Sequence, residues 1–367
     1  MENKKLRLSE EKCYKIHICK KIEKCTQVLK VHENKMKNAT QATYLGDVIS
    51  DQGTIDETIS QRSQKALGII TQISSILSSI CLGNFHFEIA LVLRDALFVN
   101  SIMVNSEVWH NVQVKHIHTL EKMDINLLKK VLNAHSKTAS EAFFLELGRY
   151  PLKYVLSKRR LMYLWHVLHR DKAELIRKVY ETQKLKHCKG DWFEIIESEK
   201  SKYDITVSDC EIAKMSKDKF KCLVESKIKA SASQWLKGEA LKHSKSRKIA
   251  EEKYEKKAYF SDTRFSKEDI QLLFSLKTKM TDCKTNFSMM YGGDLKCRIC
   301  KVENSEEDEN HLLICPILNT ENHDVKFDDV YSDIDSQYRA VKVFKKVLRR
   351  RNVYLEIIEK KKPSHQY

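Results

Sequence analysis

Glycine and proline are scarce in this sequence, which has only 9 glycines and 3 prolines among its 367 residues. Few residues are therefore available for the tight turns that a fold of many short strands requires. Charged residues account for 32% of the chain. Together these features predict a mainly α-helical fold of long amphipathic helices. The chain is long enough for two or more domains, each with its own core.

Long apolar runs are also missing. The longest uncharged stretch, Ala66 to Phe87, contains six polar side chains that are costly in hydrocarbon: Thr71, Gln72, Ser74, Ser75, Ser78 and Ser79. We therefore expect a buried helix there and no membrane partner. Eight of the 11 cysteines are scattered without regular spacing and no secretory signal precedes them, which favours a reducing intracellular compartment, nuclear or cytoplasmic. The sequon at Asn38 is then incidental, because glycosylation requires secretion.

Four potential metal ligands lie near the C-terminus: Cys297, Cys300, His311 and Cys315. Two cysteines separated by two residues can bind one ion from a tight turn, and a histidine and a cysteine four positions apart lie on one face of a helical turn. A closed shell of four ligands leaves no position for substrate, so we interpret the cluster as a structural zinc site. The alternative is four unrelated residues in a chain with 11 cysteines and 14 histidines.

The segment between the two ligand pairs is acidic. We expect the loop from Glu303 to Asn310 to be solvated and to supply no ligand. The apolar residues Leu312, Leu313 and Ile314 lie between the last two ligands, and we expect them to shield the ion.

Positive charge is in excess, with 66 lysines and arginines against 50 acidic residues and a formal net charge of +16. The excess is spread along most of the chain. Nucleic acid is the natural partner of such a surface, because each neutralised phosphate releases counterions. The alternative is a basic helical protein with no polyanionic partner.

The N-terminal region has a different pattern from the rest of the chain. Apolar and polar residues alternate in two runs, Cys13 to Ile18 and Val28 to His32, and a third run, Ala42 to Ile49, is also strand-like. Together they predict a small antiparallel sheet. The pattern then becomes helical. Capping boxes at Thr54-x-x-Glu57 and Thr138-x-x-Glu141 predict helix starts, and Gly148 predicts a helix end before Pro151.

The helix predicted after Pro151 interleaves basic and aromatic side chains: Lys153, Tyr154, Lys158, Arg159, Arg160, Tyr163 and Trp165. One interpretation is a surface that follows a phosphate backbone and stacks on bases. The other is a core face built on leucines, with the aromatic residues packed inward and ordinary solvated cations. The highly charged stretch that follows Gly190 predicts a connecting helical arm. A capping box at Ser266 opens another helix, and a last helix from about Ser336 carries a basic cluster.

Several motifs in this order resemble a known family. They are Tyr44-Leu45-Gly46-Asp47-Val48-Ile49-Ser50 with Gly53, Ile59-x-x-Arg62-x-x-Lys65-Ala66-Leu67-Gly68, Leu120-Glu121-x-x-Asp124, Leu145-Glu146-Leu147-Gly148, Arg159-Arg160-x-x-Tyr163 and Gly190-Asp191-Trp192. The chain resembles the region that follows the catalytic core in reverse transcriptases of non-LTR (LINE-type) retrotransposons. The Cys/His cluster falls where that family carries a C-terminal Cys/His module.

The resemblance implies four consecutive parts. Residues 1–53 correspond to the end of the palm, 54–190 to a thumb-like helical bundle, 191–265 to the connecting arm and 266–367 to the zinc module with its basic terminal helix. The resemblance places Tyr44, Leu45 and Gly46 on the hairpin called the primer grip, which positions the primer end. Contacts to an RNA or RNA/DNA duplex are expected from eleven cations: Arg62, Lys65, Lys153, Lys158, Arg159, Arg160, Lys345, Lys346, Arg349, Arg350 and Arg351.

The family's catalytic Ala-Asp-Asp motif is missing from this sequence. Polymerisation requires those aspartates to hold two metal ions, so we expect no catalytic residues and no catalytic magnesium here. The resulting hypothesis is a fragment that holds the template and primer without polymerase activity of its own. The alternative, from another functional class, is a non-enzymatic helical scaffold whose zinc module binds a protein partner.

Overall fold

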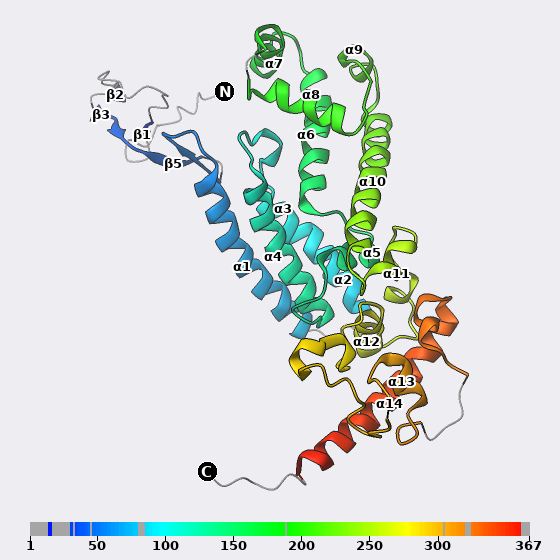
Figure 1. Ribbon diagram of the computed structural model, residues 1–367. Coiled ribbons are helices and arrows are strands. Elements are labelled where there is room, and N and C mark those ends of the chain that lie inside the picture. Colours follow the sequence, from blue (N-terminus) through cyan, green and yellow to red (C-terminus); the bar gives the residue numbers. More distant parts are fainter. Residues whose placement is uncertain are drawn as a thin grey trace. The chain divides into compact units, whose positions relative to one another are not determined.

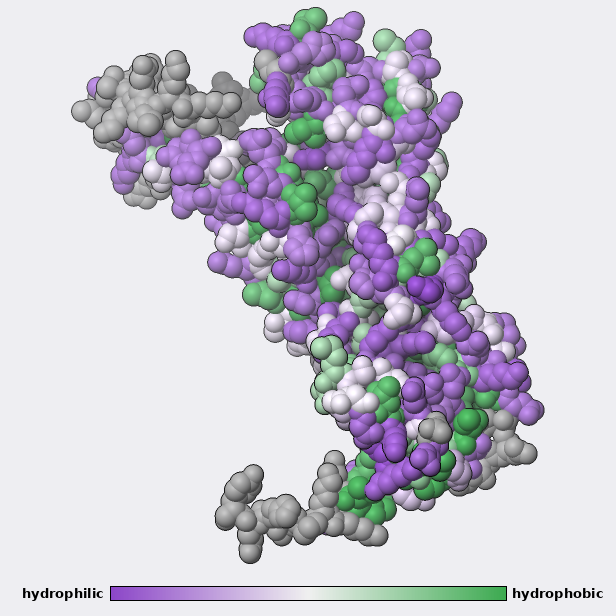
Figure 2. Space-filling view, in the orientation of Figure 1, coloured by the Kyte–Doolittle hydropathy of each residue, from purple (hydrophilic) through white to green (hydrophobic). Residues whose placement is uncertain are grey.

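The computed structural model describes residues 14–16, 30–31, 34–44, 46–79, 85–187, 189–303, 305–319 and 324–360. Over these residues the fold is mainly α-helical, as predicted, with short strands at the N-terminal end (Figure 1). Polar side chains cover most of the face seen in Figure 2, as the high charge content requires. Among the described residues, no helix combines the length and apolar character needed to cross a membrane.

The chain forms two compact units, each assembled from three segments. Unit 1 comprises Met1–Ile69, Leu97–Met123 and Leu152–Ile228, and unit 2 comprises Ile70–Ala96, Asp124–Pro151 and Lys229–Tyr367. This division follows contacts in space and does not test the four consecutive parts expected from the sequence, which stay a prediction.

The strands of unit 1 form three small pairs. β1 (Tyr14–Lys15) pairs in parallel with β4 (Lys37–Asn38), and β2 (Lys30–Val31) pairs antiparallel with β3 (Asn34–Lys35). β5 (Gln41–Tyr44) and β6 (Asp47–Ser50) form an antiparallel hairpin. The run from Ala42 to Ile49 is therefore two strands and not one, because the chain reverses next to Gly46, whose φ is +86°. Parts of the other two predicted runs lie outside the described residues.

The helices of unit 1 begin where α1 (Asp56–Ser79) follows the hairpin. Later segments contribute α3 (Asn100–Ile102), the 3-10 turn η4 (Ser106–Val108), α4 (Val114–Leu132), α6 (Leu152–Leu168), α7 (Leu175–Lys186), α8 (Trp192–Lys202), α9 (Asp209–Ile212) and α10 (Lys217–Leu241), with α1, α4 and α10 crossing a unit boundary. In α6 the leucine face is buried, including Leu161 and Leu164, and Tyr154 is only 3% exposed. The packing of α6 therefore agrees with its interpretation as a core face built on leucines.

The charged stretch predicted as an arm contains a packed helix. α10 carries six apolar residues at a spacing of four positions, all without exposed surface: Phe220, Val224, Ile228, Ala232, Leu236 and Ala240. A stripe at this spacing buries one face of a helix while the other faces stay polar. Because the segment is highly charged on average, its composition did not reveal this apolar stripe.

Unit 2 contains α2 (His86–Leu93), which runs into a π-helical turn, η3 (Arg94–Val99), at the unit boundary. It also contains α5 (Ser140–Leu147), α11 (Arg247–Glu251), η5 (Ala258–Phe260), α12 (Lys267–Lys277), η6 (Thr285–Tyr291), α13 (Glu309–Ile314), η7 (Phe327–Tyr331) and α14 (Ile334–Lys360). The predicted capping box at Ser266 is present, with Asp269 as its partner. The box at Thr138 is wrong: Ala139 precedes α5 and supplies no side-chain cap.

The predicted end of α5 is confirmed. Gly148 has a φ of +58°, and a Cβ at this position would overlap the backbone of Lys256. Glycine is therefore required here both for its left-handed conformation and for the close approach of a second segment.

Candidate metal centre

Cys297 and Cys300 are presented by a tight turn between two short extended segments. Lys296 and Glu306 form an antiparallel bridge, and the Cys297 N–H donates to the Ser305 carbonyl at 2.8 Å. The Lys301 N–H donates to the Cys297 carbonyl at 3.2 Å, and Lys301 has a φ of +53°. The turn therefore points both sulfur atoms to the same side.

The other two ligands come from α13. Asp308 caps this helix by accepting a hydrogen bond from the His311 N–H at 2.7 Å. Cys315 follows the last helical residue, one turn after His311. The predicted relation between the histidine and the cysteine is therefore confirmed.

The four ligand atoms converge to within 4.8 Å of one another. Cys300 Sγ and His311 Nε2 are 3.4 Å apart. Zinc–sulfur bonds of about 2.3 Å in a tetrahedron place sulfur atoms about 3.8 Å apart, so only a small contraction around an ion is needed. The predicted cluster of ligands is confirmed, and three thiols with one imidazole suit zinc. That the metal is zinc stays a prediction.

Apolar side chains shield the cluster in part as expected. Leu312 and Leu313 are buried, but Ile314 is 71% exposed, so its predicted shielding role is wrong. One helical turn cannot aim three consecutive side chains at the same side. The remaining cover comes from Ile299 and Leu318 and from Val347 of α14.

Burial affects the protonation of the ligands. It raises the pKa of Cys297 to about 11 and also raises the pKa of Cys315. Burial acts in the same direction on Cys300, but hydrogen bonds from the Val302 N–H and the Ser305 hydroxyl lower its pKa overall. Since thiolates bind the metal, an arriving ion has to displace protons from the two buried thiols.

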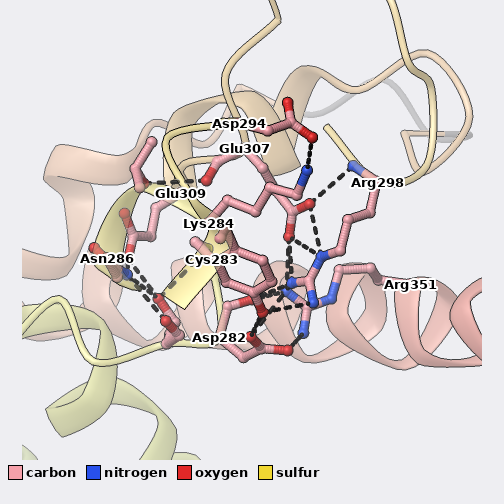
Figure 3. A network of polar contacts seen from close by, with 12 residues as sticks. Asp282, Cys283, Lys284, Asn286, Asp294, Arg298, Glu307, Glu309 and Arg351 are labelled. Carbon is pink, nitrogen blue, oxygen red and sulfur yellow. Dashed lines mark hydrogen bonds and ion pairs between the residues drawn. The ribbon is translucent and has the colours of Figure 1, made fainter. Parts of the chain in front are cut away.

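The acidic loop between the ligand pairs is not solvated throughout, contrary to our expectation. Glu307 has no exposed surface and lies 2.5 Å from Arg298 Nη2 (Figure 3). Glu309 is 3% exposed and accepts a hydrogen bond from the Asn286 amide at 2.6 Å. These acids therefore fix the loop from inside the fold. Nothing in their local sequence distinguishes them from solvated neighbours, because their partners lie in other segments.

A network of charges joins this region to the terminal helix. Arg351 of α14 lies 3.0 Å from Asp282 and 3.6 Å from Glu307 (Figure 3). Arg298 also approaches Asp282, at 3.3 Å. We refer to residues 296–318 as the metal module. Through Arg351 and Val347, α14 is bound to the module by both ionic and apolar contacts.

Three of the eleven predicted nucleic-acid contacts are buried. Arg62 is 4% exposed and pairs with Asp47, and Arg160 is 7% exposed and pairs with Glu199. Arg351 is 3% exposed within the network described above. Their guanidinium groups serve the interior of the fold, so a phosphate backbone cannot reach them there.

The other eight predicted contacts differ in exposure. Five are half-buried and have partners: Lys153 over the Tyr154 ring, Lys158 with Glu225, Arg159 with the Met103 carbonyl, Lys345 with Asp269 and Arg350 with the Leu318 carbonyl. The other three are exposed: Lys65 on α1, and Lys346 and Arg349 on α14. These eight lie in both units, and the described contacts do not gather them into one site.

The predicted primer-grip residues lie at the turn of the β5–β6 hairpin. Tyr44 ends β5 with 65% of its surface exposed, and Gly46 is in the turn. Leu45 lies outside the described residues. Comparison with protein-family models, with curated proteins and with solved structures finds no match to this chain.

Proposed function

We propose that this chain is the nucleic-acid-holding C-terminal part of a non-LTR reverse transcriptase. In this proposal it binds the template and primer, and its structural zinc orders the C-terminal module. The observation that carries the proposal is a rigidly held hairpin that presents an exposed tyrosine, at the position where the motif resemblance implies a primer grip.

The hairpin is held from both sides of Asp47. One carboxylate oxygen accepts from Arg62 Nη2 at 2.8 Å, and the other accepts from the Asn105 amide at 2.9 Å. The Thr58 hydroxyl accepts from the Val48 N–H at 2.9 Å and lies 3.2 Å from the Val48 carbonyl. β6 is therefore tied to α1 and to the segment after α3, while Tyr44 stays free to contact a ligand.

The aspartates of the recognised motifs have structural partners. Asp47 is held as described, and the fully buried Asp124 receives two hydrogen bonds from Arg94, at 2.7 and 2.5 Å. Asp191 caps α8 by accepting from the Glu194 N–H at 2.9 Å. Carboxylates that already accept such hydrogen bonds are poor candidates for the ligands of a two-metal polymerase site. This supports the part of the proposal that assigns binding, and not polymerisation, to this chain.

The test is binding of a fluorescent RNA/DNA primer–template duplex, measured by anisotropy over a range of salt concentrations. We expect binding that weakens steeply as salt rises. Replacing Tyr44 with alanine should weaken binding about 5- to 150-fold, because stacking on an aromatic side chain contributes about 1–3 kcal/mol per base.

The matched control is Phe85→Ala, which removes another exposed ring, 61% exposed, in unit 2. This variant should bind like the unaltered chain. Equal losses in both variants would count against a specific role of Tyr44. Template-dependent DNA synthesis by the chain alone would refute the assignment of binding without polymerisation.

A helical scaffold remains the second candidate function, because apolar side chains are exposed on the metal module. Val302 is 50% exposed, Ile314 is 71% exposed and Ile317 is 37% exposed. Such side chains near a structural zinc suit a protein partner. Absence of duplex binding even at low salt would favour this function over the first.

A further inference from the structure

Three lysines from separate segments of unit 2 lie close to the ring of His135, and a fourth lies close to one of them, Lys245. Lys129 is in α4, Lys137 follows His135, Lys245 precedes α11 and Lys279 follows α12. We propose that this lysine site, defined by these four residues and His135, binds a phosphate group of a polynucleotide backbone. The inference rests on the proposed function and adds a contact site that sequence motifs did not reveal.

The site is held together by an aromatic residue and by backbone carbonyls. The rings of His135 and Phe287 have centroids 4.8 Å apart, and Lys245 Nζ lies 5.1 Å from the Phe287 centroid. Lys245 Nζ also donates to the Asn286 carbonyl at 2.5 Å, and Lys129 Nζ donates to the Ser136 carbonyl at 2.5 Å. The ammonium groups of Lys129 and Lys245 are therefore positioned by neutral partners that leave their charge uncompensated. Lys279 Nζ lies over another neutral group, 5.9 Å from the centroid of the Phe327 ring.

The charges in the site repel one another. Burial lowers the pKa of Lys245, and Lys137 and Lys279 lower it further, while Glu309 acts in the opposite direction. Among the residues that the structure describes, none of the four ammonium groups has a carboxylate within 4.0 Å. Glu309 itself accepts hydrogen bonds from Asn286 and Thr281. A bound anion would relieve this repulsion.

His135 can add a hydrogen bond to such an anion. Burial lowers its pKa, and so do Lys137, Lys245 and Lys129, which favours the neutral ring. Its Nδ1 accepts a hydrogen bond from the Lys137 N–H at 3.1 Å. In the neutral ring Nε2 therefore carries the proton and can donate to a phosphate oxygen.

The metal module positions one side of the site. The Thr285 N–H donates to the Glu307 carbonyl at 3.2 Å. The Asn286 amide donates to Glu309 (Figure 3). Both acceptors belong to the loop between the two ligand pairs. η6, which carries Phe287, is therefore attached to the module, and the lysine site depends on the order of that loop.

Phosphate backbone is the chemistry that these groups recognise. Lysine ammonium groups and an imidazole N–H contact phosphate oxygens without reading base edges. Phe287 is already in contact with His135 and Lys245, so it is not available as a stacking platform. We therefore expect binding here to be independent of sequence and sensitive to salt.

The test replaces Lys137 with glutamine, because this exposed side chain can be changed without disturbing the core. Each lost phosphate contact lowers the salt slope of duplex binding by about 0.9, which corresponds to about eightfold weaker binding at about 0.1 M salt if affinity at 1 M is unchanged. Lys245→Gln should act in the same direction. The matched control is Lys229→Gln, an exposed lysine of the same unit that lies near Glu255.

A second measurement needs no variant. Acylation of lysines followed by mass spectrometry should show that the duplex protects Lys129, Lys137, Lys245 and Lys279, while Lys229 stays reactive. Duplex binding without this protection, and with unchanged Gln variants, would refute the lysine site and leave the proposed function intact. No duplex binding at all would instead refute the proposed function. Protection by inorganic phosphate alone, with none by the duplex, would overturn the polynucleotide assignment.

Discussion

Replacing Cys297 with serine should unfold the metal module without unfolding unit 1. The cysteine is 1% exposed and is one of four ligand atoms that converge within 4.8 Å. Serine is a poor zinc ligand, so the variant loses one member of the closed shell. The small apolar cluster around Ile299, Leu312 and Leu318 would then lack the ion that we expect to hold its segments together.

The size of the effect follows from the kind of site. Structural zinc supplies an apparent free energy of about 10–16 kcal/mol to a small module at neutral pH. Whole domains are stable by only about 5–15 kcal/mol. The free energy lost with the ion is therefore larger than the stability that the module could have without it. Because Val347 and Arg351 bind α14 to the module, we expect loosening to extend into the second half of α14.

Hydrogen exchange with mass spectrometry measures this directly. Residues 296–318 and the second half of α14 should lose protection, while α6 in unit 1 should keep it. Bound zinc, measured by elemental analysis, should fall from about one equivalent to less than half. The control is Cys222→Ser, because Cys222 is exposed on α10. Unchanged protection of the module in the Cys297 variant would refute the reasoning.

Two further predictions concern buried charges of unit 2. Lys277, fully buried, lies 2.8 Å from both Glu146 and Glu252, so Lys277→Met should lower the free energy of unfolding by about 3–5 kcal/mol in urea titrations. Adding Glu146→Gln should restore much of this loss, and no restoration would contradict the charge argument. Burial raises the pKa of Asp269, but hydrogen bonds from two lysines lower it overall to about 2, against an ordinary value of 3.8. This depression contributes about 2 kcal/mol of stability above pH 4, which is lost as the pH falls toward 2. Asp269→Asn should lack that pH dependence, and an unchanged acid transition would exclude the effect.

The parts of this protein that the sequence predicted are encoded locally. The ligand spacings at Cys297 and His311 lie within one turn and one short helix. The same holds for the box at Ser266 and for the glycine at 148. Each depends on residues three or four positions apart, so one segment carries all the information. The residue pattern alone predicted one strand from Ala42 to Ile49, whereas the family resemblance implied a hairpin there, and β5 and β6 form one.

The basic residues could not be assigned in this way. The sequence pattern suggests that Arg62 and Arg160 are surface cations, but both are buried in ion pairs. Arg62 pairs with Asp47 and Arg160 pairs with Glu199, and each acid comes from another segment. A net charge of +16 does not distinguish cations with buried partners from cations without them. Only tertiary contacts do so. The same limit applies to Glu307, which was expected in solvent and is fully buried.

The lysine site could not be predicted from the sequence for the same reason. Its four lysines are spread over about 150 positions of the sequence, so no motif can represent them, yet the fold places three of them near one imidazole and the fourth near Lys245. The metal module holds η6 against that imidazole through Glu307 and Glu309. An ion that only orders a loop can therefore still affect ligand affinity, because the loop positions Phe287 and the carbonyl that Lys245 contacts.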